Sequence, residues 1–263
     1  LAQEFVNDLF STLRERMLDL RYCTVVFVGG GAISAPIIGK DFNWTGGDGT
    51  YQVIDDDGGD WRIKFPYSGT FTPLKNMVID AFLVGAGGGK GYTRCGGGGA
   101  GYTTTVRSIV LAANTSYSIV VGAAGTNGRS SGSDGTNGGT TSAFSAVAAG
   151  GKGSTTGKGT QGIGLSGSGG SGGGGYNISG VHAQRSAADG GTDGTDGTTI
   201  TSAGGTGQGT TTREFGEADG ELYASGGGDN LTATVPNSGN GGAYGIAPAD
   251  GIVVIRQHKE VAA

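Results

Sequence analysis

The side chains best suited to binding lie in one short segment of the glycine-rich middle of the chain. Between positions 176 and 185 the sequence places an aromatic ring, two amides, an imidazole and a guanidinium group: Tyr176, Asn177, His182, Gln184 and Arg185. An aromatic ring supplies a flat apolar face, and the polar groups supply directional hydrogen bonds. This combination suits noncovalent recognition of sugars or of protein loops. The alternative interpretation is a plain solvated loop.

Two further interruptions of the glycine runs carry similar side chains. Tyr92 and Arg94 lie in the first of them, and Asn230 lies in the second, at residues 229–237. Connecting loops gather at the ends of parallel extended runs, and recognition residues concentrate on such loops. We therefore expect the receptor-binding residues in these three segments.

Patterns for catalysis, metals and cofactors are incomplete. Gly162–Gly167 matches G-x-G-x-x-G, but the glycine–serine run that follows cannot begin the helix of a dinucleotide site. The acidic run Asp55–Asp60 is followed by Pro66 where an EF-hand calcium loop needs glutamate, so a hairpin turn is expected there. Two histidines, His182 and His258, cannot make a three-ligand zinc site unless cysteine or carboxylate joins them. We expect no enzymatic activity, no metal and no cofactor.

Composition restricts the class of protein. Glycine makes up 60 of the 263 residues, against roughly 18 in an average chain of this length. Collagen needs glycine at every third position, and the segment from Gly151 to Gly159 breaks that period. Full disorder is not expected, because 35% of the residues are hydrophobic, enough for a core. A net charge of −5 without a basic stripe argues against nucleic-acid binding, and no apolar segment is long enough for membrane insertion.

The elements that would carry these loops are mostly strands. In Trp61–Phe65, apolar and basic side chains alternate, as in a strand with one buried face. Short strands separated by glycine predict an antiparallel β-sandwich. The predicted strands are Tyr51–Ile54, Trp61–Phe65, Gly69–Thr72, Val78–Val84, Tyr102–Ile109, Tyr117–Val121, Thr140–Val147, Glu221–Ala224 and Ile252–Arg256. The predicted core comprises Trp61, Ile63, Phe65, Phe82, Val84, Tyr117, Ile119, Val121, Phe215 and Val254.

Residues 146–212 need another source of order. Their few large apolar side chains cannot offset the backbone entropy of so many glycines. Extended polyproline II runs can instead lie side by side and exchange backbone hydrogen bonds, with glycine required for close approach. We expect such a bundle here.

The N-terminal region is predicted to attach the chain to a partner or to its own copies. Residues 2–20 form an apolar stripe at helical spacing, which indicates either a packing helix or an oligomerisation helix. A strand, Cys23–Val28, and an irregular connection over 29–50 follow. Cys23 and Cys95 are expected to be free thiols in a reducing cytoplasm, with one disulfide as the alternative.

The chain therefore divides into four regions. Residues 1–40 form an attachment region, 41–145 the first part of the sandwich, 146–212 the glycine-rich insertion, and 213–263 the completion of the sandwich with a C-terminal tail.

A series of glycine motifs in fixed order carries a family resemblance. It consists of Phe82–Gly89, Gly96–Tyr102, Tyr117–Gly125, Gly138–Ser142, Gly204–Glu217, Tyr223–Gly228 and Gly251–Arg256. The series resembles the glycine-rich domain proteins encoded in tailed phages and prophages, usually near tail-fibre genes. It covers roughly residues 49–257 of the chain.

Two broader comparisons extend this resemblance. In role, the chain is similar to the tip adhesins of T-even-type long tail fibres, whose distal loops contact the host. In layout, it resembles the extracellular region of the anaplastic lymphoma kinase receptor family, where a glycine-rich lattice is inserted into a tumour-necrosis-factor-like β-sandwich.

The resemblance implies a jelly-roll or tumour-necrosis-factor-like sandwich with an inserted polyproline II-type bundle, in a protein of the virion tail that presents loops for host attachment. Expected partners are other tail or baseplate proteins through residues 1–40, a host-surface glycan or protein, and further copies of the chain, with a homotrimer as one arrangement. The alternatives are a purely structural tail or filament subunit and a bacterial surface adhesin.

Overall fold

The computed structural model describes residues 35–47, 49–55, 61–92, 95–130, 132–155, 170–173, 212–228, 231–232 and 234–257. The predicted helix over 2–20, the strand Cys23–Val28 and most of the segment 146–212 lie outside these ranges. The described part is mainly β, with a single short 3-10 turn at Glu214–Gly216. In these ranges no helix is long and apolar enough to cross a membrane.

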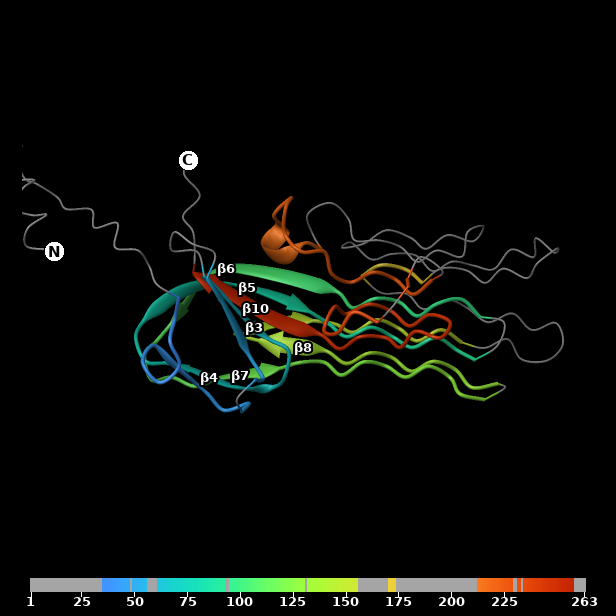
Figure 1. Ribbon diagram of the computed structural model, residues 1–263, viewed down its shortest axis with the longest axis horizontal. Coiled ribbons are helices and arrows are strands. Elements are labelled where there is room, and N and C mark those ends of the chain that lie inside the picture. Colours follow the sequence, from blue (N-terminus) through green and yellow to red (C-terminus); the bar gives the residue numbers. More distant parts are fainter. Residues whose placement is uncertain are drawn as a thin grey trace, which may run out of the picture. The chain divides into compact units, whose positions relative to one another are not determined.

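Ten strands in the described ranges form two antiparallel five-stranded sheets (Figure 1). The first sheet has the order β1 (Phe42–Trp44), β4 (Gly69–Pro73), β7 (Tyr117–Val120), β8 (Thr141–Ala143) and β9 (Ala146–Ala148). The second sheet has the order β2 (Gln52–Asp55), β3 (Trp61–Phe65), β10 (Ile252–Gln257), β5 (Met77–Val84) and β6 (Thr103–Leu111). The last strand in the described ranges, β10, thus lies between two strands from the first third of the chain.

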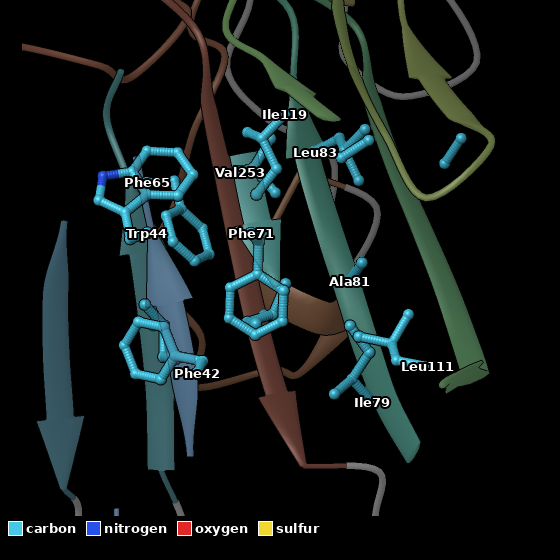
Figure 2. Close-up of a cluster of buried hydrophobic side chains, with 14 of the residues drawn as sticks. Phe42, Trp44, Phe65, Phe71, Ile79, Ala81, Leu83, Leu111, Ile119 and Val253 are labelled. Carbon is cyan, nitrogen blue, oxygen red and sulfur yellow. The ribbon is translucent and has the colours of Figure 1, made fainter. Parts of the chain in front are cut away.

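The inner faces of the two sheets pack against each other (Figure 2). Phe65 of the second sheet lies between Trp44 and Phe71 of the first, with ring centroids 4.7 and 5.8 Å apart. Alternation along β3 places Trp61, Ile63 and Phe65 on this face, as the sequence predicts. Burying one such side chain contributes about 1.5–3 kcal/mol to folding. This aromatic core fixes the position of both sheets.

A second apolar cluster lies on the opposite face of the second sheet. The segment 212–224 covers this face, and Phe215 is buried there beside Phe82, with ring centroids 6.2 Å apart. The predicted core residues therefore divide between two clusters. Trp61, Ile63, Phe65 and Ile119 lie in the inner core with Tyr117 and Val121 partly buried against it, whereas Phe82, Val84, Phe215 and Val254 lie in the second cluster.

Three predictions of secondary structure differ from the structure. The predicted strand Thr140–Val147 is a hairpin of β8 and β9, because Phe144 and Ser145 both adopt positive φ, 51° and 64°. The predicted strand Glu221–Ala224 contributes only an isolated bridge, between Leu222 and Arg213, and belongs to the covering segment. The segment 29–50, predicted to be an irregular connection, contains the strand β1.

Extended glycine-rich runs continue from one end of both sheets (Figure 1). We call these runs, listed here, the glycine bundle: 85–91, 95–102, 122–130, 132–140, 149–155, 170–173, 224–228 and 238–251. Many of them lie outside the predicted insertion 146–212, since several strands of the two sheets extend directly into the bundle.

The run 85–91, which follows β5, lies at the centre of the bundle. Among the described residues its N–H groups donate to the runs 95–102, 132–140 and 246–251, and its carbonyl oxygens accept from 122–130, 149–155 and 238–243. Gly85 and Gly88, three positions apart, both donate to the run 95–102, over 2.9 Å each. A repeat of three residues is the period of a polyproline II helix. Backbone groups without sheet partners are thereby satisfied.

The close spacing of the runs explains the glycine content. A Cβ built on Gly87 would overlap the carbonyl oxygen of Asn240, and one built on Gly97 would overlap that of Gly227. At these positions a backbone carbonyl occupies the space of the side chain, so a larger residue would force the runs apart.

Candidate functional site

The candidate site is the end of the glycine bundle that lies farthest from the two sheets. Val84 pairs with Thr103 and with Ile252, so the runs that adjoin β5, β6 and β10 leave the second sheet at the same edge. Away from this edge the runs reach three segments: Lys90–Tyr92, Asn127–Ser133 (of which residue 131 lies outside the described ranges) and Gly242–Ile246. We call these three segments the distal end.

A single amide side chain joins the three segments. The Oδ1 atom of Asn127 accepts the N–H of Lys90 over 2.7 Å, and its Nδ2 group donates to the carbonyl oxygens of Ile246 and Ala243 over 2.8 and 3.3 Å. The Asn127 amide uses its acceptor and its donor group in these contacts. Because three chain segments share these bonds, their relative positions are fixed at the distal end.

Tyr244 stands on a tight turn that this amide supports. Ala243 and Ile246 exchange backbone hydrogen bonds of 3.0 and 3.1 Å across the turn. Gly245 has a φ of 72°, a left-handed conformation that glycine adopts readily. The Tyr244 side chain is 85% exposed, so a rigid support carries a solvent-facing aromatic ring.

Tyr92 follows the central run and lies beside a second turn. Its N–H donates to the carbonyl oxygen of Ser133 over 3.0 Å, and its side chain is 48% exposed. The turn at 128–133 is held by Ser133, whose N–H and hydroxyl both donate to the carbonyl oxygen of Ser130, over 3.0 and 2.7 Å. Arg129 on this turn is exposed.

Buried polar groups fix the base of the loop that follows Tyr92. The hydroxyl of Ser154 accepts the N–H of Gly91 over 2.7 Å and donates to the carbonyl oxygen of Gly96 over 2.8 Å. Lys90 Nζ lies 3.5 Å from the Sγ atom of Cys95, which is a buried free thiol. The chain is therefore anchored at Gly91 and at Gly96, before and after the predicted loop Tyr92–Arg94.

Of the predicted receptor-binding residues, the structure describes only Tyr92, which is exposed at the distal end. The others lie outside the described ranges: Arg94, Tyr176, Asn177, His182, Gln184, Arg185 and Asn230. Their assignment stays a prediction.

The sequence reasoning missed Tyr244 and Arg129. A signal for Tyr244 exists, since a large aromatic residue within Gly-Gly-Ala-Tyr-Gly cannot pack between runs that lie as close together as those at Gly87 and Gly97. No comparable signal distinguishes Arg129 from other surface cations.

A buried network of charges lies elsewhere, on the outer face of the second sheet. The Glu214 carboxylate is 2.9 Å from Arg62 Nη1 and 3.2 Å from Lys64 Nζ, and it accepts the Tyr223 hydroxyl over 3.2 Å. Burial, together with the carboxylates of Glu214 and Glu221, raises the pKa of the Tyr223 hydroxyl far above its ordinary value. The hydroxyl therefore remains a hydrogen-bond donor at neutral pH.

The segment 212–224 is fixed by a second set of contacts. Arg256 donates to Glu217 over 2.5 Å and lies 4.2 Å from the ring centre of Phe215, while Arg107 donates to the Phe215 carbonyl oxygen over 2.6 Å. The hydrogen bonds and charge contacts among these groups hold the segment on the sheet. In the described ranges no group of three or more histidine, cysteine, aspartate or glutamate residues could hold a metal ion.

Comparison with known proteins identifies the family. The model of a family described as a glycine-rich domain matches residues 66–257, which include β4 to β10 and the described glycine bundle. The chain belongs to this family. No curated protein matches the sequence.

Proposed function

We propose that this member of the glycine-rich domain family is a structural protein of a phage tail fibre or tail tip, and that it presents the distal end of its bundle to the host-cell surface. The observation that carries the proposal is the exposure of Tyr92 and Tyr244 on a backbone framework held by hydrogen bonds. Exposed aromatic residues on ordered supports are typical of recognition surfaces.

Binding would be noncovalent and would need neither a metal nor a cofactor. The predicted loops carrying Arg94, Tyr176–Arg185 and Asn230 would extend the same surface. Several copies on one virion would convert weak individual contacts into strong attachment, because each further contact forms at a high effective concentration. Residues 1–40 would join the chain to neighbouring tail or baseplate proteins. We also propose that the strands of the two packed sheets are connected as in a jelly roll or a tumour-necrosis-factor-like sandwich.

A purely structural role in a tail or filament is the second candidate. The backbone network around the run 85–91 favours it, since a lattice of this kind gives stiffness even without a ligand. On this alternative, the exposed tyrosines would have no binding partner.

The two roles differ in what the isolated protein does. We would raise antibodies against the purified chain, label virions of the phage that encodes it, and measure whether the purified chain blocks adsorption to its host. Labelled tails and blocked adsorption are expected for the attachment role. Labelled tails without blocking would support the structural role, and unlabelled virions would refute both.

A further inference from the structure

Tyr244 combines high exposure with a fixed support. It is the most exposed of the large hydrophobic side chains in the described ranges, and its turn is closed by two backbone hydrogen bonds. Leaving an aromatic side chain in water forfeits the free energy that its burial would contribute. A ligand that covers the ring would recover this free energy on binding.

The support reduces the cost of binding. A loop that must become ordered on binding loses conformational entropy, whereas a turn already held by Asn127 loses little. Asn127 also bonds to the N–H of Lys90, two residues before Tyr92. One amide therefore supports both exposed aromatic residues of the distal end.

The surroundings of these rings indicate the class of ligand. Glycine and serine occupy five of the six positions of the turn at 128–133, so hydroxyl and peptide groups rather than apolar side chains prevail there. A stable protein–protein interface has a buried apolar core with aromatic anchors inside pockets. Isolated rings among hydroxyl, amide and peptide groups instead match a sugar, which offers an apolar face of C–H groups and a rim of hydroxyls.

We propose that the distal end is a glycan-binding site in which the Tyr244 ring stacks on the face of a pyranose and Tyr92 provides a second aromatic contact. Asn127 is a positioning residue, since its side chain holds the turn through backbone groups. The ligand class is a surface polysaccharide of the host. The inference rests on the proposed attachment function for the location of that glycan.

The test measures binding of the fluorescently labelled full-length protein to cells of the host by flow cytometry. Host cells are used untreated, treated with periodate to destroy sugar rings, or treated with proteinase K to remove surface proteins. Tyr244→Ala and Tyr244→Phe are compared with wild type. Tyr67→Ala is the matched control, because Tyr67 is 56% exposed on the turn between β3 and β4, away from the distal end.

We expect periodate to abolish binding and proteinase K to leave it unchanged. Tyr244→Ala should weaken binding by about tenfold, which corresponds to about 1.4 kcal/mol. Tyr244→Phe keeps the ring and should stay within about threefold of wild type, an effect below 1 kcal/mol, and Tyr67→Ala should bind like wild type. The melting temperature of each variant should match that of wild type, because neither tyrosine ring is buried.

Three results would overturn the inference. Unchanged binding by Tyr244→Ala would remove this ring from the site. Binding that survives periodate but not proteinase K would identify a protein receptor, and the attachment function would stand without the glycan. If the wild-type protein bound no cells that its phage adsorbs to, the proposed attachment function would fail as well.

Discussion

The side-chain amide of Asn127 donates to the backbone carbonyl oxygen of Ile246 over 2.8 Å, although 119 positions separate the two residues in the sequence. This contact joins the end of the run that follows β7 to the turn that precedes β10. Runs that continue from the first sheet and from the second sheet are thus joined at the distal end, in addition to the backbone hydrogen bonds along the bundle and the aromatic core between the sheets.

Asn127→Ala should destabilise this end of the bundle. The substitution leaves the Lys90 N–H without its acceptor and removes the Nδ2 donor from two carbonyl oxygens, which keep only the backbone bonds between Ala243 and Ile246. A buried group left unsatisfied costs about 1–3 kcal/mol. We expect the free energy of unfolding to fall by about 2 kcal/mol in urea denaturation. Amide hydrogen exchange at Ala243 and Ile246 should also quicken. Asn43→Ala, at an exposed position of β1, is the control and should change neither measurement. Equal exchange in both variants would show that the backbone alone holds the turn.

Gly97→Ala tests the spacing of the bundle. The added methyl group would overlap the carbonyl oxygen of Gly227, and overpacking of this kind costs about 1–3 kcal/mol. A thermal melt should show a lower transition temperature for this variant, whereas Ala123→Ser, at an exposed position of another run, should melt like wild type. A wild-type melt for Gly97→Ala would mean that the runs separate easily, which contradicts a lattice held by backbone hydrogen bonds.

Side-chain alternation was enough to predict part of the fold. The strand Trp61–Phe65 is confirmed to the residue, because a face of aromatic and aliphatic side chains alternates with Arg62 and Lys64. In β5 the side chains from Ile79 to Val84 are all buried. No alternation distinguishes the two faces there, so the sequence could not assign Phe82 to a second cluster.

The sequence predicts that a bundle of closely packed glycine runs exists, but not which runs adjoin or which residues meet at the distal end. Glycine content indicates close backbone packing, but a run without side chains carries no pattern that selects its neighbours. The neighbours that the run 85–91 has among the described residues therefore cannot be read from the sequence. For the same reason the sequence did not place Asn127 beside Lys90 or bring Tyr244 to the distal end, since both depend on which runs adjoin.

Phe82→Ala should be strongly destabilising. Phe82 is fully buried between Phe215 and Tyr223, and truncating such a ring costs about 3–5 kcal/mol. Val110→Ala, at a position that is 74% exposed on β6, is the control and should change the free energy of unfolding by less than about 0.5 kcal/mol. A cost below about 1 kcal/mol for Phe82→Ala would show that the segment 212–224 does not hold this cluster.

Glu214→Gln tests the buried charge network. The substitution preserves the shape of the side chain but removes the charge that faces Arg62 and Lys64. Breaking a buried ion pair costs about 3–5 kcal/mol; Arg62 is one-third exposed, which lowers our expectation to about 2 kcal/mol. Limited proteolysis should then cut the segment 212–224 sooner. Asp219→Asn, at an exposed position of the same segment, should leave the digestion pattern unchanged.

Alkaline pH should destabilise the protein through Tyr223. Burial and two nearby carboxylates raise the pKa of its hydroxyl in the folded state, whereas in the unfolded state the pKa returns to about 10. Below pH 10 both states hold the proton, so the contribution to stability is constant. Above pH 10 the unfolded state releases the proton while the folded state keeps it, so the free energy of unfolding falls as the pH rises.

We would measure this free energy by urea denaturation from pH 8 to pH 11.5, for wild type and for Tyr223→Phe. The variant should be less stable at pH 8, because Glu214 loses a hydrogen bond, but its stability should decline less steeply above pH 10. Equal slopes for the two proteins would mean that solvent reaches the hydroxyl and that the segment 212–224 does not seal this face of the sheet.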